Sequence, residues 1–212
     1  MGLYNTKPAF REALRPLAKR WSFIHPDCWT WVAVGVSALA GALFLSAERR
    51  PQILLGIPLL LFLRLVLNVF DGVVAQVRAL SSARGEALSE FADRLSDIVI
   101  LGGFAASGCG DARLAAGAIV VVFLVSYVGI LGKAVGAGRQ YGGLMGKPDR
   151  MAVVGTACLL QYGALQGQLT PPSCWGFQAT FFDWGSIVIV TLGLYTIRAR
   201  LLTIFRTLET QL

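Results

Sequence analysis

The sequence has little of what a soluble protein or a zinc protein needs. Only 15% of its 212 residues are charged, whereas 55% are hydrophobic. The mean hydropathy of +0.63 is also high. A soluble domain of this length needs more polar surface. Histidine occurs once, at His25, and the four cysteines include no CxxC pair, so neither a histidine-based site nor a zinc motif is expected.

Other common signatures are also missing. The segment GRQYGGLMGKPDR is not a phosphate-binding P-loop, because Gly142 and Gly146 are one residue too close and Pro148 stands in the Ser/Thr position. No short apolar leader with a cleavage site precedes the first apolar run near Cys28, so a signal peptide is not expected. The apolar segments show no internal repeat and no paired broken helices, which argues against a small transporter.

Long apolar runs dominate what remains. Six are close to the ~20 residues that a bilayer requires. They are 28–47, 53–77, 87–108, 113–135, 151–168 and 182–202. Backbone groups in lipid must bond within their own segment, so these runs are expected to be helices. The predicted fold is an all-α, multi-pass membrane protein with six transmembrane helices in residues 28–212.

Residues 1–27 are expected to form a separate cytoplasmic, amphipathic helix. In KPAFREALRPLAKRW, apolar residues such as Phe10 and Leu14 fall on one stripe and basic residues such as Arg11 on another. That pattern suits a helix at the surface of an anionic membrane, although a simple basic flank that sets topology remains an alternative.

Lys and Arg predict the orientation. Fourteen lie on the side that holds both termini and the loops after the second and fourth runs, and three lie on the other side. Both termini are therefore predicted to be cytoplasmic. The basic residues follow the loops rather than one folded face, so no nucleic-acid partner is expected. Cys109 and Cys174 fall on the far side, where an oxidising compartment would permit a disulfide.

The second and third runs carry polar residues that are costly in a membrane, by about 2.5–3.5 kcal/mol for a charged residue at the centre. They recur at spacings of four, three and four, which places each set on one helical face. The second run has Arg64, Asn68, Asp71 and Ala75, and the third has Glu86, Glu90, Asp93 and Asp97.

Two such helices joined by a short loop can bring their polar faces together near the cytoplasmic end. Hard oxygen ligands favour Mg²⁺, Mn²⁺ or Ca²⁺. A structural ion-pair cluster with Arg64 and Arg94, and an ion pathway, are the alternatives from spacing alone.

These residues also follow a recognisable motif. The sequence reads Asn68-x-x-Asp71-Gly72-x-x-Ala75-Gln76, eight residues, then Gly85-x-x-x-Ser89-x-x-x-Asp93. It resembles the CDP-alcohol phosphotransferase motif D-x-x-D-G-x-x-A-R-x8-G-x-x-x-D-x-x-x-D in every spacing. Asn68, Gln76 and Ser89 replace an aspartate, the arginine and another aspartate. The basic N-terminal segment, DRLSD and GKPDR extend the resemblance over most of the chain.

The resemblance implies a membrane transferase of phospholipid synthesis. Such an enzyme moves a phosphoryl-alcohol group from a CDP-alcohol, typically CDP-diacylglycerol, to a second alcohol and releases CMP. It implies two divalent metals, Mg²⁺ or Mn²⁺, and a homodimer. The metal ligands expected here are Asn68, Asp71, Glu90, Asp93 and Asp97, with Glu90 compensating for Ser89. The CDP-binding residues expected here are Asp71, Gly72, Ala75, Gln76 and Gly85.

Within that resemblance, Asp93 fills the last motif position and is the expected general base. Lys147, Arg150 and Arg64 are the candidate acceptor-binding residues, although Lys147 and Arg150 are equally typical of a topology signal. The substitutions leave two alternatives to an active variant. One is a catalytically inactive relative that acts as a membrane partner, and the other is a small transporter.

Overall fold

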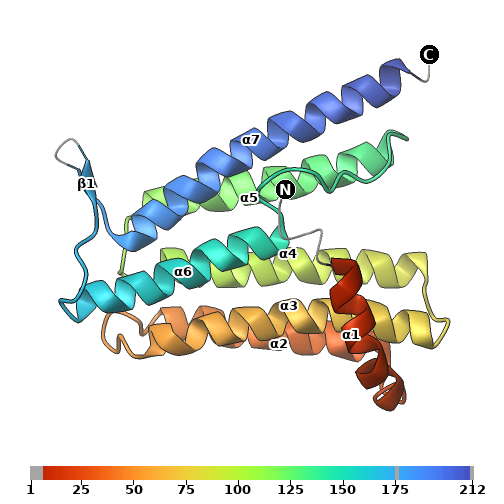
Figure 1. Cartoon of the computed structure of the whole chain (residues 1–212), viewed down its shortest axis with the longest axis horizontal. Coiled ribbons are helices and arrows are strands. Elements are labelled where there is room, and N and C mark those ends of the chain that lie inside the picture. The colour runs from red at the N-terminus through yellow and green to blue at the C-terminus, as the bar shows by residue number, and fades with distance from the viewer. Residues whose placement is uncertain (1–6, 175–176, 211–212) are drawn as a thin grey trace. The chain divides into compact units, whose positions relative to one another are not determined.

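The structure is a computed structural model that describes residues 7–174 and 177–210. Seven helices and one short hairpin lie within these residues (Figure 1). They are α1 (Lys7–Arg20), α2 (Pro26–Phe44), α3 (Ile53–Val77), α4 (Ala83–Ala105), α5 (Ala112–Ala134), α6 (Lys147–Leu165), β1 (Ser173–Cys174), β2 (Phe177–Gln178) and α7 (Phe181–Glu209). The chain forms two compact units, which meet in sequence at Gly108 and Cys109.

In the first unit, α2 packs against both α3 and α4. The contact between α2 and α4 is backbone to backbone: a Cβ added to Gly103 would overlap Gly41, whose Cα would be 2.8 Å away. A Cβ added to Gly41 would lie 2.5 Å from the carbonyl oxygen of Val99. These glycines allow close helix packing, the usual role of small residues in membrane helices. The close contact leaves α2 beside the polar stretches of both neighbours.

Helix boundaries in this unit follow from local capping. The backbone N–H of Asp27 donates to His25 Nδ1 at 3.3 Å, and Pro26 occupies the first helical position of α2. Ser82 accepts a hydrogen bond from the N–H of Gly85 at 3.1 Å and begins α4. Because of this cap, the helix begins four residues before the predicted apolar run and includes Glu86 in its first turn.

The N-terminal helix is present as α1, and Pro16 lies within it. Its apolar stripe is divided between two environments. Leu14 packs on a cluster of Ala18, Phe70 and Val73 where α1 meets α3. Leu17, in contrast, is exposed. Part of the face expected to contact lipid therefore contacts α3, and the interfacial role stays a prediction.

In the second unit, α7 packs against both α5 and α6. Gly193 of α7 has no room for a side chain, because Val121 of α5 lies against it. The carboxylate of Asp183 accepts hydrogen bonds from Thr180 N at 2.8 Å and Asp111 N at 2.6 Å, so it joins the start of α7 to the start of α5. The side chain of Cys174 lies outside the described residues, so its pairing with Cys109 stays a prediction.

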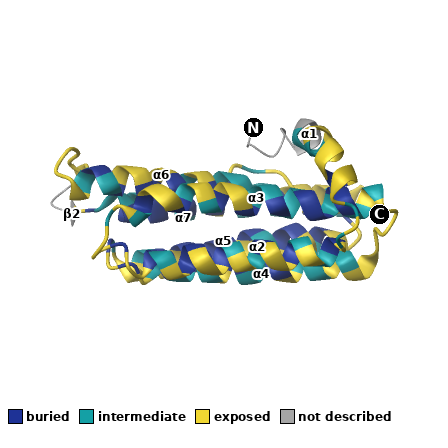
Figure 2. Cartoon of the chain, turned by 90° about the horizontal axis from the view of Figure 1, so that it is seen from below, coloured by how far each residue is buried: buried dark blue, intermediate teal, exposed yellow. Residues whose placement is uncertain are grey.

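Each of the six predicted apolar runs lies mostly within one helix, although the runs 28–47, 87–108 and 151–168 each extend three residues beyond the helix end, and the helices differ in composition. Among the described helices, α2, α3, α5 and α7 are long and apolar enough to cross a membrane. Large apolar side chains such as Leu59 and Phe62 are exposed on α3, as expected for a lipid-facing surface. Figure 2 shows buried and exposed residues along each helix. The acidic α4 and the α6 helix that begins with KPDR do not meet that composition, so six spans remain a prediction.

Candidate functional site

The candidate site lies within the first unit, where the C-terminal half of α3 faces the N-terminal half of α4. Asp71 of α3 and Asp93 and Asp97 of α4 are all buried, with at most 5% of each residue exposed. Arg64 of α3 is also buried, with 1% exposed. Half of each predicted polar stripe therefore lies inside the unit, and the two stripes contact each other there through their side chains.

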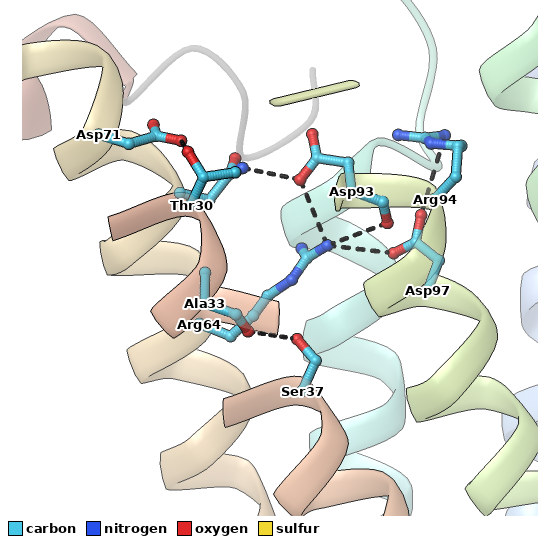
Figure 3. Close-up of polar contacts among 9 residues, drawn as sticks. Thr30, Ala33, Ser37, Arg64, Asp71, Asp93, Arg94 and Asp97 are labelled. Atoms are coloured by element: carbon cyan, nitrogen blue, oxygen red, sulfur yellow. Dashed lines mark hydrogen bonds and ion pairs between the residues drawn. The ribbon is translucent and has the colours of Figure 1, made fainter. Parts of the chain in front are cut away.

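Asp93 is the centre of these contacts (Figure 3). Its Oδ1 accepts a hydrogen bond from Asn68 Nδ2 at 2.7 Å and lies 3.5 Å from Arg64 Nη2. The same Nη2 is 3.4 Å from Asp97 Oδ1. Arg94 Nη1 lies 3.8 Å from the other oxygen of Asp97. The ion pairs required by the structural alternative are thus present, and two of them use one nitrogen atom of Arg64.

Asp71 is held from a different helix. The hydroxyl of Thr30, on α2, donates to Asp71 Oδ2 at 2.7 Å, and Thr30 is itself buried (Figure 3). The backbone N–H of Gly72 donates to Asp71 Oδ1. Thr30 was not found from the sequence, because no motif position or stripe includes it. The one feature that could have indicated Thr30 is its position one turn into α2, the helix that packs against α3.

The remaining predicted ligands, Asn68 and Glu90, are half-buried. Ser89 is also half-buried, whereas Glu86 and the predicted CDP-binding residue Gln76 are exposed. Within the described residues, no three His, Cys, Asp or Glu side chains converge on one point. The donor atoms nevertheless have the right chemistry for a hard divalent cation, since carboxylate and amide oxygens are the ligands that Mg²⁺ and Mn²⁺ prefer. The residues fit such an ion in donor type, but Asp93 and Asp71 already bond to protein groups.

Gly72 is open on the side where a Cβ would project. The nearest atom to such a Cβ is Arg11 Nη2 of α1, at an ordinary contact distance of 3.6 Å. A Cβ at Gly85 would meet only the capping oxygen of Ser82, at 3.4 Å. Neither glycine is needed for helix packing, unlike Gly41 and Gly103. This favours the explanation that the glycine beside Asp71 leaves room for a ligand.

Lys147 and Arg150 belong to the second unit, at the start of α6. Arg150 is buried and Lys147 is half-buried. The carboxylate of Asp149 accepts a hydrogen bond from the N–H of Gly146 at 3.0 Å, so it supports the helix start, as expected. Their role towards an acceptor stays a prediction.

Arg200 of α7 holds the loop that precedes α6, and this role was not predicted from the sequence. Its Nη1 donates to the carbonyl of Val125 at 2.6 Å, and its Nε donates to that of Gly142 at 2.8 Å. It therefore ties the loop before α6 to α5 and α7. The sequence predicts Arg200 only as part of the basic excess that sets the topology, and no sequence pattern indicates its two carbonyl partners.

Solved structures of a phosphatidylinositol phosphate synthase share this fold. The chain matches the Mycobacterium tuberculosis phosphatidylinositol phosphate synthase PgsA1 with CDP-DAG bound at a TM-score of 0.67 and 20% identity, over 94% of this chain and 93% of that one. It matches the manganese and citrate complex of that synthase at a TM-score of 0.68 and 20% identity, over 94% and 88% of the two chains. PgsA1 is a CDP-alcohol phosphotransferase, so the chain has the fold of that class.

A closer relative is found by sequence. Inner membrane protein YnbA of Escherichia coli strain K12 is 32% identical over 158 residues, which are 73% of this chain and 78% of that protein. The chain belongs to the same family as YnbA. No family model matches the sequence. The apolar helices and this relationship together identify an integral membrane protein.

Proposed function

We propose that this chain is a CDP-alcohol phosphotransferase that moves a phosphatidyl group from a lipid CDP-alcohol, CDP-diacylglycerol, to an acceptor alcohol and releases CMP. The observation that carries the proposal is the arrangement of the motif residues: Asp71 and Asp93, from two helices, are buried in one unit, beside the open backbone of Gly72. The fold shared with PgsA1 supports it.

In this proposal the cytidine diphosphate group approaches α3 at Gly72 and Ala75, with Gln76 and Gly85 at its edges. Gly72 is suited to this because only the end of the Arg11 side chain faces it. Gln76, which is exposed, keeps hydrogen-bonding groups where the motif has an arginine but brings no charge. The acyl chains stay in lipid, next to exposed apolar residues such as Phe62.

Asp93 is the proposed general base. It would accept the proton of the attacking hydroxyl, and Asn68 would hold its carboxylate in place through the 2.7 Å hydrogen bond. Thr30 would position Asp71 in the same way. Both partners come from neighbouring helices, so the orientation of the two acids depends on the packing of α2, α3 and α4.

A divalent cation, Mg²⁺ or Mn²⁺, would be held by Asp71 with Asn68, Glu90, Asp93 and Asp97 as the further ligand candidates. When bound, such an ion offsets negative charge that develops on the phosphate oxygens. The structure of PgsA1 with manganese supports a metal of this kind. Half-buried Glu90 lies one turn before Arg94 and has the reach to add a carboxylate that Ser89 lacks.

Lys147 and Arg150 are the proposed contacts for an anionic acceptor such as a phosphorylated polyol. Arg64 was a third candidate, but its contacts are with Asp93 and Asp97. We also propose six spans, cytoplasmic termini and active site, and a homodimer. Support for the topology comes from the excess of basic residues in the loops on one side.

The deciding experiment is a CMP-release assay. The purified protein is incubated with CDP-diacylglycerol, Mg²⁺ or Mn²⁺ and a panel of alcohols, and CMP is measured. CMP formed only when a particular alcohol is present is the expected result. If no CMP forms with any alcohol or metal, the enzyme proposal is wrong.

A non-catalytic membrane partner is the second candidate, and one observation favours it. The buried acids are already compensated by Arg64, Asn68 and Arg94, so the cluster is able to persist as a structural element. The double change Asn68→Asp with Ser89→Asp separates the candidates. A silent parent and an active double variant would identify an inactive relative.

A further inference from the structure

Arg64 differs from the other basic residues near the site in burial and in position. It lies in the middle of α3, a helix that is otherwise apolar up to Asn68, and only 1% of its side chain is exposed. Its Nη2 is 3.5 Å from Asp93 Oδ1 and 3.4 Å from Asp97 Oδ1. One guanidinium nitrogen therefore bridges two buried carboxylates, which is the place that a metal ion takes between acidic ligands (Figure 3).

The negative charge of the site is reduced in the same region. Two motif positions that would carry aspartate are neutral here, at Asn68 and Ser89. Asn68 also donates its amide N–H₂ to Asp93 Oδ1, the oxygen that Arg64 approaches. Two N–H donors thus approach this oxygen atom of Asp93, and a cation bound to it would have to replace them. The site has two carboxylates fewer than the full motif, and Arg64 adds one positive charge. Two divalent ions bound to its side chains would therefore leave an excess of positive charge.

We infer that the Arg64 guanidinium supplies one of the positive charges of this site, so that the chain holds a single divalent cation where the resemblance implies two. The inference rests on the proposed function. Asp71 is the carboxylate proposed to hold the single ion, because Arg64 pairs with Asp93 and Asp97, whereas the hydroxyl of Thr30 and the backbone N–H of Gly72 orient the oxygens of Asp71. Asp93 and Asp97 are the pair assigned to Arg64.

A purely structural bridge accounts less well for the other atoms of Arg64. Its Nε and Nη1 are buried and make no hydrogen bond to any residue in the described part of the chain. Buried N–H groups are normally paired, since leaving one unpaired is unfavourable. These two donors are able to bind oxygen atoms of a bound ligand, as well as water. The guanidinium thus contacts the acids through one nitrogen, and its other two donor nitrogens have no hydrogen-bond partner among the described residues.

The test counts bound Mn²⁺ by equilibrium dialysis and electron paramagnetic resonance on the purified full chain in detergent. The native protein is expected to bind one Mn²⁺ per chain. In Arg64→Met, which removes the charge and keeps an unbranched chain, a second Mn²⁺ is expected, together with a larger upward shift of the melting temperature when Mn²⁺ is added.

Arg94→Met is the matched control. Arg94 also pairs with Asp97, but at 3.8 Å and with 23% of its side chain exposed, and no ion pair joins it to Asp93 in the described structure. The Arg94→Met variant is therefore expected to bind one Mn²⁺ per chain, like the native protein. If Arg64→Met does not fold without metal, the count for the native protein decides: one ion supports the inference, and none or two overturn it. A folded Arg64→Met that still binds one ion overturns it as well.

The CMP assay keeps this result separate from the proposed function. A native protein that binds two Mn²⁺ and releases CMP overturns the assignment of Arg64 and leaves the transferase intact. A native protein that binds one Mn²⁺ and releases no CMP keeps the charge assignment and overturns the transferase.

Discussion

Gly72 and Gly103 offer a direct test of where a ligand approaches this protein. Both are glycines inside helices, but their surroundings differ. A Cβ at Gly72 would meet only Arg11 Nη2, at 3.6 Å, whereas a Cβ at Gly103 would overlap the backbone of Gly41, with its Cα at 2.8 Å. Changing each to alanine adds the same methyl group, at Gly72 beside the end of a flexible side chain and at Gly103 into a helix contact.

The two substitutions are expected to change stability in opposite directions. Alanine in a helix is favoured over glycine by about 1 kcal/mol, and Gly72→Ala should gain up to this amount because nothing rigid lies in the way. Gly103→Ala has the same gain but also forces α2 and α4 apart, and overpacking costs about 1–3 kcal/mol. For a chain of this size about 1 kcal/mol moves the melting temperature by roughly 2–4 °C.

The order should be reversed for activity: Gly72→Ala, the more stable variant, is expected to lose more activity than Gly103→Ala. If the nucleotide contacts the backbone at Gly72, a methyl group there displaces it, and a shift of about 1 Å in a reacting group costs roughly 10²-fold in rate. Gly72→Ala is therefore expected to melt at or above the native temperature and to lose about 10²-fold in kcat/KM for CMP release. Thermal unfolding in detergent and the CMP assay measure the two quantities. Native activity in Gly72→Ala, or destabilisation as large as in Gly103→Ala, would refute this reasoning.

Three further outcomes are expected. Asp93→Asn should lower CMP release by about 10²–10⁴-fold while nucleotide binding persists; undiminished release would exclude Asp93 as the base. Thr30→Val should weaken Mn²⁺ binding by about 10–100-fold by releasing Asp71, and Thr30→Ser should restore it; equal affinities in all three proteins would contradict a positioning role. Single cysteines placed at Leu80 and Tyr141 should react with a membrane-impermeant thiol reagent from the same side, and labelling from opposite sides would disprove the topology.

The helices and the buried acids were largely predictable, because each depends on a periodic pattern. Apolar runs of about 20 residues predict helices whatever their neighbours are. The four-three-four spacing placed Asp71 on one face of α3, and Asp93 and Asp97 on one face of α4, all of them buried. The helix starts were less accurate, because the Ser82 cap extends α4 into polar sequence that a hydropathy pattern excludes.

The partners of the acids were only partly predictable. Arg64 shares a helical face with Asp71, and Arg94 precedes Asp97 by three residues, so spacing suggested both arginines, and their ion pairs with Asp93 and Asp97 are present. Thr30 lies 41 residues before Asp71 and reaches it only because α2 packs on α3. No local pattern encodes such a contact. The same holds for the open side of Gly72, since glycine in a sequence indicates equally a ligand site or close helix packing.

The buried charged residues Arg64, Asp93 and Asp97 compensate one another, which explains how the interior of this unit accommodates them. Removing one partner of a buried ion pair usually destabilises a protein more than replacing the whole group, because a single unpaired charge remains in a low-dielectric interior. Arg64 has two carboxylates to compensate, and Asn68 bonds to one of them. An aspartate at position 68 would therefore add a third negative charge beside a guanidinium that already serves two. The neutral residue at 68 and the arginine at 64 therefore form one electrostatic unit, and replacing either residue changes the charge balance around Asp93 and Asp97.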